Sequence, residues 1–133
     1  MTAAAETMTS DERAAHPGPG NRPPAWAVLA EALVQRRPVS ARYHGRQRLL
    51  CPHALGWKNG RARVLAYQAG GTTSHGGLPA DPRQRWRSLF IDEIDHPALT
   101  DGEWQTADNY TSASNCIDEL EIDVNTPSRS YHQ

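Results

Sequence analysis

Cysteine is scarce in this chain of 133 residues, which contains only Cys51 and Cys116. Two distant thiols form neither a disulfide framework nor a metal cluster of the usual spacing, so a disulfide-stapled fold is excluded. We expect Cys51, in the middle of a predicted strand, to be a small buried hydrophobe. No apolar run approaches the length of a membrane span, and the N-terminus lacks the pattern of a signal peptide. We therefore expect no membrane contact and a cytoplasmic location.

Lysine is also nearly absent, since thirteen of the fourteen basic residues are Arg. Residues 36–63 contain no Asp or Glu at all. Residues 32–91 carry 11 basic residues and one acid, whereas residues 92–133 carry ten acids and one Arg. This asymmetry favours a basic face for an anionic partner, with an acidic segment able to shield it. The plainer alternative is that the acidic part only neutralises the basic part.

Alternation of apolar and polar residues predicts a mainly β (α+β) fold. Val39, Ala41 and Tyr43 alternate with polar residues, which is the period of a half-buried strand. Asn59 and Gly60 supply the positive φ angles of a tight hairpin. The predicted antiparallel strands are Val39–His44, Arg46–Trp57, Arg61–Gln68 and Arg85–Asp92. An extended segment around Pro97–Leu99 is expected to close a small barrel of four to five strands.

A short helix is predicted before the strands, at Ala25–Gln35. Trp26, Leu29 and Leu33 form one apolar stripe, and Pro38 ends the helix. The chain is expected to form one domain, residues 23–124, between a disordered arm (1–22) and a disordered tail (125–133). Within the C-terminal extension, residues 114–120 fit a short helix capped by Ser114. The alternation of residues 120, 122 and 124 fits a strand equally well; we choose the helix.

Arginine interleaved with aromatic residues suits a nucleotide or single-stranded nucleic acid, because rings stack on bases while Arg holds phosphates. The residues of this kind are Tyr43, Trp57, Tyr67 and Trp86 with Arg48, Arg63, Arg85 and Arg87. The alternative is that the tyrosines are core residues and the arginines are solvated. In that case the chain is an interaction protein for a protein partner or a homodimer.

Enzymatic and metal chemistry find less support. The histidines at 44, 53, 75 and 96 lack the spacing of metal ligands. Asp92, Glu93 and Asp95 end a predicted strand, where solvated acids are common, and no Ser-His or Cys-His pairing is visible. The sequence therefore favours a non-enzymatic module without metal or cofactor, with a hydrolytic enzyme as a minor alternative.

With these elements placed, the chain resembles the WYL domain family, a small Sm-like β-barrel module of bacterial regulators. The resemblance covers residues 25–94. It is carried by the helix, the PVSARYHG strand, the segment RLLCPHAL, the hairpin, RVLAYQ and WRSLFIDEI. The family's name-giving triplet reads Arg63-Val64-Leu65 here. The resemblance implies a stand-alone version without the usual helix-turn-helix domain.

The resemblance further implies ligand sensing or nucleic-acid binding in transcription regulation. The positions that match the family's pocket are Tyr43, Arg48, His53, Tyr67 and Arg87, with Arg63, Arg85 and Trp86 as secondary ligand-binding residues. Arg48 and Arg87 share strand parity with apolar core residues, so both are expected to be partly desolvated. If Asp92 and Glu93 pair with them, the arrangement is a structural ion pair. If not, they are left for a phosphate.

Overall fold

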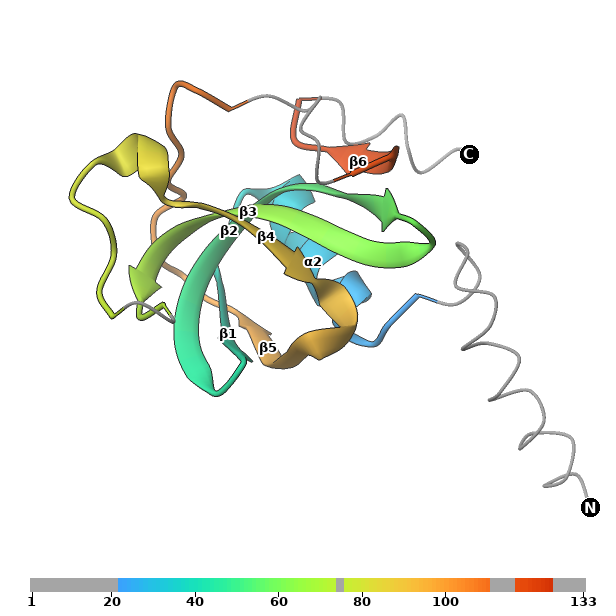
Figure 1. The fold of residues 1–133 in the computed structure, drawn as a ribbon, viewed down its shortest axis with the longest axis horizontal. Coiled ribbons are helices and arrows are strands. Elements are labelled where there is room, and N and C mark those ends of the chain that lie inside the picture. Colours follow the sequence, from blue (N-terminus) through green and yellow to red (C-terminus); the bar gives the residue numbers. More distant parts are fainter. Residues whose placement is uncertain (1–21, 74–75, 111–116, 126–133) are drawn as a thin grey trace, which may run out of the picture.

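The computed structural model describes residues 22–73, 76–110 and 117–125, which form one helix and six strands in a mainly β fold (Figure 1). The elements are α2 (Ala25–Gln35), β1 (Val39–Tyr43), β2 (Arg46–Lys58), β3 (Arg61–Gly71), β4 (Trp86–Phe90), β5 (Ile94–Leu99) and β6 (Glu119–Asp123), with 3-10 helices η2 (Pro82–Gln84) and η3 (Ile91–Glu93). No helix in these ranges is both long and apolar enough to cross a bilayer.

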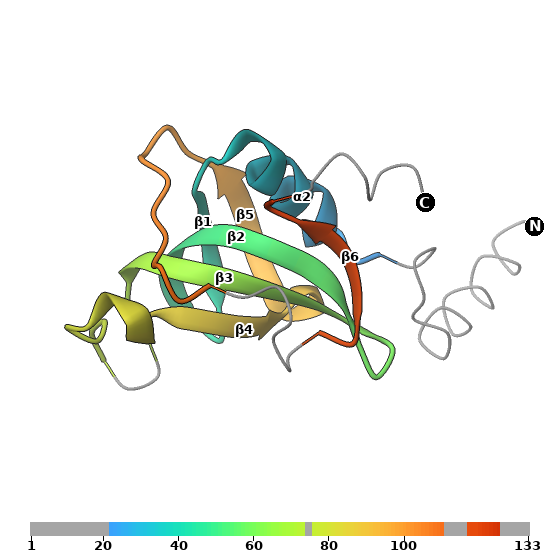
Figure 2. The same ribbon diagram turned by 90° about the horizontal axis from the view of Figure 1, so that it is seen from above.

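The strands form one antiparallel sheet in the order β4-β3-β2-β1-β5. The long strand β2 organises it. One edge of β2 pairs with β3, while the other edge pairs first with β1 and then with β6. Two irregularities interrupt the β2–β3 register, and such bulges bend strands. Figure 2 shows the resulting curvature, with α2 lying across the sheet beside β5 and β6.

The main core lies between α2 and one face of this sheet, here called the inner face. The apolar stripe of the helix is buried there, and the Trp26 ring stacks on Trp57 of β2 with centroids 5.3 Å apart. The sheet contributes alternate residues from each strand, including Val39, Leu50, Val64 and Leu89. The opposite side is the outer face, and it carries Cys51, Leu65 and Tyr67. Alternation along each strand therefore decides which side chains can meet.

The helix, the Asn59-Gly60 hairpin and the first three strands are confirmed, with ends shifted by up to three residues. The segment around Pro97–Leu99 is confirmed as part of β5. The fourth strand is shorter than predicted, because η3 begins at Ile91 and turns the chain towards β5. The strands β4 and β5 stand at opposite ends of the strand order and are not paired with each other, so the sheet is open there.

The predicted helical turn is wrong for residues 119–120, which belong to β6. The strand forms because β2 offers a free edge, and Gly56 lets it approach: a Cβ there would meet the carbonyl oxygen of Glu119 at 2.2 Å. The expectations for residues 1–21, for the cap at Ser114 and for residues 126–133 lie outside the described residues.

Candidate functional site

Arg48 of β2 points to the inner face. It pairs with Ala41 of β1, and Leu50, two residues along, is fully buried. The Arg48 side chain is only 6% exposed. Its Nη1 donates one long hydrogen bond, 3.5 Å, to Oε1 of Gln68, and its buried Nε has no partner among the described residues. Because a guanidinium does not deprotonate in proteins, a full positive charge is held at the margin of the core.

Arg87 reaches the same face from β4, where it pairs with Ala66 of β3. Its Nη1 donates to the carbonyl oxygens of Gln84 (3.1 Å) and Trp86 (2.9 Å). Burial is the first cause that lowers the pKa of the Arg48 guanidinium, and the positive charge of Arg87 is the second. The structure therefore places both cations on the inner face, where the charge of Arg87 disfavours the charge of Arg48.

Tyr43 of β1 packs beside this pair. Its ring lies 5.2 Å from the guanidinium carbon of Arg48 and 4.0 Å from the His44 ring, centroid to centroid. Its hydroxyl accepts a hydrogen bond from the backbone N–H of Phe90 (3.1 Å), which links β1 to the end of β4. Burial raises the pKa of Tyr43, so the phenol is neutral near pH 7 and supplies no negative charge.

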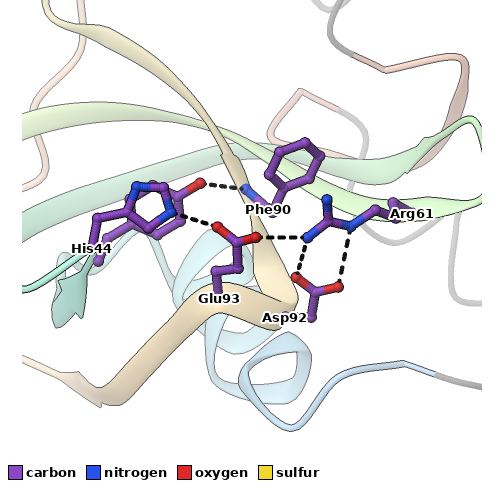
Figure 3. A network of polar contacts seen from close by, with 6 residues as sticks. His44, Arg61, Phe90, Asp92 and Glu93 are labelled. Carbon is purple, nitrogen blue, oxygen red and sulfur yellow. Dashed lines mark hydrogen bonds and ion pairs between the residues drawn. The ribbon is translucent and has the colours of Figure 1, made fainter. Parts of the chain in front are cut away.

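The acids of η3 bind other partners, as Figure 3 shows. Arg61 donates to Oδ1 of Asp92 (2.7 Å) and to Oε2 of Glu93 (2.9 Å). His44 Nε2 lies 2.5 Å from Oε1 of Glu93. The Arg61 guanidinium also lies over the Phe90 ring, 3.6 Å from its centroid. The side chains of Arg61, Asp92 and Glu93 are 39%, 44% and 38% exposed, so water screens the network and its energy is modest.

This network answers the question that the sequence left open. Asp92 and Glu93 pair with Arg61 and not with Arg48 or Arg87. Within the described ranges, the positive charges that act on Arg48 come from Arg87 and Arg46, and no carboxylate is among the groups that act on it. The inner-face arginines therefore do not form a structural ion pair there.

The expected partners His53, Tyr67 and Trp86 lie on the outer face. Tyr67 pairs across strands with Trp86, and their rings meet edge to face at 5.2 Å. The His53 ring is 4.7 Å from Trp86, 4.8 Å from Trp104 and 5.1 Å from Tyr110. The strand register places Tyr67 and Arg87 on opposite faces, because Arg87 pairs with the residue before Tyr67. The structure therefore divides the expected set of five into two groups.

His53 is 2% exposed and fully hydrogen-bonded. Its Nδ1 lies 2.8 Å from the carbonyl oxygen of Cys51, and its Nε2 lies 2.8 Å from the hydroxyl of Thr106. Since a carbonyl only accepts, Nδ1 carries the proton and Nε2 accepts from Thr106. Burial lowers the pKa of His53 to about 4, so the ring is neutral near pH 7. This histidine anchors the segment of residues 104–110 to the outer face.

Arg63 and Arg85, which were expected as secondary ligand-binding residues, contact other groups than Arg48. Arg63 donates to the hydroxyl of Ser88 at 3.2 Å, and its guanidinium carbon lies 4.3 Å from the Phe90 centroid. Arg85 donates to the carbonyl oxygen of Pro79 at 2.8 Å and so holds the loop before β4. Both arginines act on the local structure of β3 and β4.

Two residues beside Arg48 were missed by the sequence reasoning. Gln68 is fully buried on the inner face and donates to the carbonyl oxygens of Gly70 and Thr72. Its parity with Val64 could have revealed it as a polar residue at a core position. Gly71 pairs with Arg48 at a φ of 88°, and a Cβ there would lie 2.2 Å from the carbonyl oxygen of Gln47. Only glycine permits this close approach of β3 to the start of β2.

No group of three or more His, Cys, Asp or Glu side chains able to hold a metal occurs in the described ranges. His44 is bound to Glu93, and His53 is buried among aromatic rings. His75 lies outside the described residues. Cys51 is a free buried thiol that accepts a hydrogen bond from the Gln105 N–H at 3.4 Å, and burial raises its pKa. The thiolate that a nucleophile needs is therefore disfavoured.

Comparisons of the chain with protein-family models, with curated proteins and with solved structures find no match. The resemblance to WYL domains therefore remains an expectation from the sequence.

Proposed function

We propose that this protein is a non-enzymatic regulatory module that binds an anionic ligand, either a nucleotide or single-stranded nucleic acid, at Arg48 and Arg87. The observation that carries the proposal is the Arg48 side chain, which is 6% exposed and has an unpartnered Nε. Burying a charge without a partner is costly, and a bound phosphate would relieve that cost. The acids of η3 cannot do so while they pair with Arg61.

The energetic case favours a phosphate over a neutral ligand. Charge-assisted hydrogen bonds are about twice as strong as neutral ones, and each contributes roughly 1.5–3 kcal/mol. A planar guanidinium suits two phosphate oxygens at once. Tyr43 is the ring that packs against Arg48 on this face, but it is only 6% exposed and stacks on His44. His53, Tyr67 and Trp86 occupy the outer face, and Trp57 is buried against Trp26. The proposal therefore depends on phosphate binding by the arginines and not on base stacking.

Features of the fold support the proposal that this sheet is related to the Sm-like barrel of WYL domains. A helix precedes five strands whose order is β4-β3-β2-β1-β5, and the sheet is curved (Figures 1 and 2). The single turn of η3 connects β4 to β5 along the chain, and the Phe90–Tyr43 hydrogen bond links the end of β4 to β1. A role in transcription regulation follows from the resemblance and belongs to the same proposal.

Fluorescence anisotropy with short single-stranded DNA, RNA and cyclic nucleotides tests the function. Affinity should fall between about 50 mM and about 200 mM salt, because phosphate contacts release counterions. Arg48→Met should weaken the tightest ligand at least about tenfold, the equivalent of one charge-assisted contact.

Arg42→Met is the matched control. Arg42 is an exposed residue of β1 and lies on the face of the sheet opposite Arg48. This variant therefore removes the same charge away from the proposed site. It should change affinity little. If none of the ligands binds, or if both variants lose the same affinity, the proposal fails, and a protein partner becomes the better explanation of the fold.

A further inference from the structure

The charges around Arg48 indicate which kind of phosphate the site prefers. Arg87 and Arg46 both act on Arg48 as positive charges, and Tyr43 is neutral near pH 7. No carboxylate in the described ranges offsets them. A phosphodiester in a nucleic-acid backbone carries one negative charge, whereas a terminal phosphomonoester carries close to two near pH 7. The excess positive charge is therefore better matched by a phosphomonoester.

The burial of Arg48 points the same way. One side of its guanidinium is covered by the Tyr43 ring, and Gly71 packs on its backbone, where an added Cβ would lie 2.7 Å from the Cα of Arg48. Its Nη1 is already directed at Gln68. A phosphodiester has bulky substituents on both sides of phosphorus, while a phosphomonoester has one. A group that reaches a side chain only 6% exposed must be narrow, which favours the end of a ligand over the middle of a strand.

We propose that Arg48 and Arg87 bind a terminal phosphomonoester dianion in preference to an internal phosphodiester. This inference rests on the proposed function and names the ligand group for the same site. Two sources offer this group: a nucleoside monophosphate and the phosphorylated end of an oligonucleotide.

The first experiment compares oligonucleotides of one sequence with a 5′-phosphate and with a 5′-hydroxyl. The phosphorylated form should bind at least about tenfold more tightly, since one additional charge-assisted contact is worth about that factor. Competition with a nucleoside 5′-monophosphate separates the two sources. Equal competition per molecule supports the inference with a mononucleotide as ligand, and weaker competition supports it with a nucleic-acid end.

The second experiment uses the protonation of the phosphate. Its second pKa is about 6, so at about pH 5 the monoester loses one of its two charges. The preference for the phosphorylated oligonucleotide should shrink at that pH, with the hydroxyl form as the control for any effect on the protein. Arg46, Arg48 and Arg87 keep their charges throughout this range.

Among the titratable groups packed near the site, the His44 ring stacks on Tyr43 and pairs with Glu93. The variant His44→Asn removes this histidine and suits its φ of 51°, which Asn tolerates. The pH effect should persist in that variant. If the pH effect is absent in His44→Asn, it comes from His44 and not from the phosphate dianion, and the inference is overturned.

Arg48→Met and Arg87→Met should each abolish most of the preference, while Arg42→Met should keep it. A melting curve for each variant separates loss of binding from loss of folding, and Arg48→Lys, which keeps the charge, should retain part of the preference. Equal binding of the two oligonucleotides by the wild-type protein would overturn this inference and leave the proposed function standing. Binding of neither form would overturn both.

Discussion

The two faces of the sheet bury a basic side chain in different ways. His53 on the outer face is 2% exposed, and Arg48 on the inner face is 6% exposed. The histidine gives up its charge, because burial lowers its pKa to about 4, and both ring nitrogens are hydrogen-bonded. Arg48 keeps its charge and leaves Nε without a partner. Similar burial therefore leaves a neutral, fully hydrogen-bonded side chain on the outer face and a charged, incompletely hydrogen-bonded side chain on the inner face.

The largest expected effect concerns the pH dependence of stability through His53. Its folded pKa is about 4 and its ordinary value is 6.5. Because the pKa of His53 is lower in the folded state, its contribution to the free energy of unfolding is complete above pH 6.5 and is lost as the pH falls to 4. The loss should reach about 3 kcal/mol, at 1.36 kcal/mol for each pKa unit.

Urea unfolding at pH 7 and pH 4 measures this effect. The variant His53→Gln does not titrate, so its stability should fall by clearly less than that of the wild type between these values. Carboxylates such as Glu93, whose pKa is lowered, contribute to both proteins and cancel in the difference. If the free energy of unfolding falls by the same amount in both proteins between pH 7 and pH 4, burial does not keep His53 neutral.

A second prediction tests the packing that encloses Arg48. Gly71→Ala should destabilise the fold by about 2 kcal/mol, because it combines a positive φ with a backbone clash. Gly45→Ala is the control, since Gly45 has a similar φ of 77° but no atom lies within 4 Å of the position that an added Cβ would take. Chemical unfolding should find the Gly71 variant clearly the less stable of the two. Equal losses would mean that β3 does not press on the start of β2.

A third prediction separates stability from binding at Arg48. Arg48→Met removes a buried charge and keeps an apolar stem of similar length. Stability should stay within about 1 kcal/mol of the wild type or increase, because replacing poorly paired buried charges by apolar groups is often neutral or stabilising. Thermal melting without ligand measures this. A large loss of stability would indicate that Arg48 has a stabilising partner in the native state, contrary to the view that its charge is left unpaired.

The smallest effect is expected at the η3 network. Arg61→Ala removes contacts to Asp92 and Glu93, but these side chains are exposed and screened by water. We expect a loss of under about 1 kcal/mol, which should shrink at high salt. A change in ligand affinity in this variant would show that Arg61 keeps Asp92 and Glu93 away from Arg48.

Local patterns were sufficient for most of the fold. The apolar stripe of residues 25–35 predicted α2, and Asn59-Gly60 predicted the β2–β3 hairpin, because these signals act over a few residues. Parity along β2 and β4 predicted that Arg48 and Arg87 share a side with the core. For residues 120–124 the sequence allowed a strand as well as the helical turn that we chose, because the alternation around Ile122 becomes a strand only through pairing with β2, whose Gly56 admits it.

The helix, the main strands and an arginine-rich stretch without acids between residues 36 and 63 can be recognised from the sequence alone. The pairing of the charges depends on the tertiary structure. Asp92 and Glu93 stand close in sequence to Arg87, yet the turn of η3 and the register of β3 bring them to Arg61. It also decided that His53 and Tyr67 lie on the face opposite Arg87. Partner choice depends on distances between strands, which no local pattern contains.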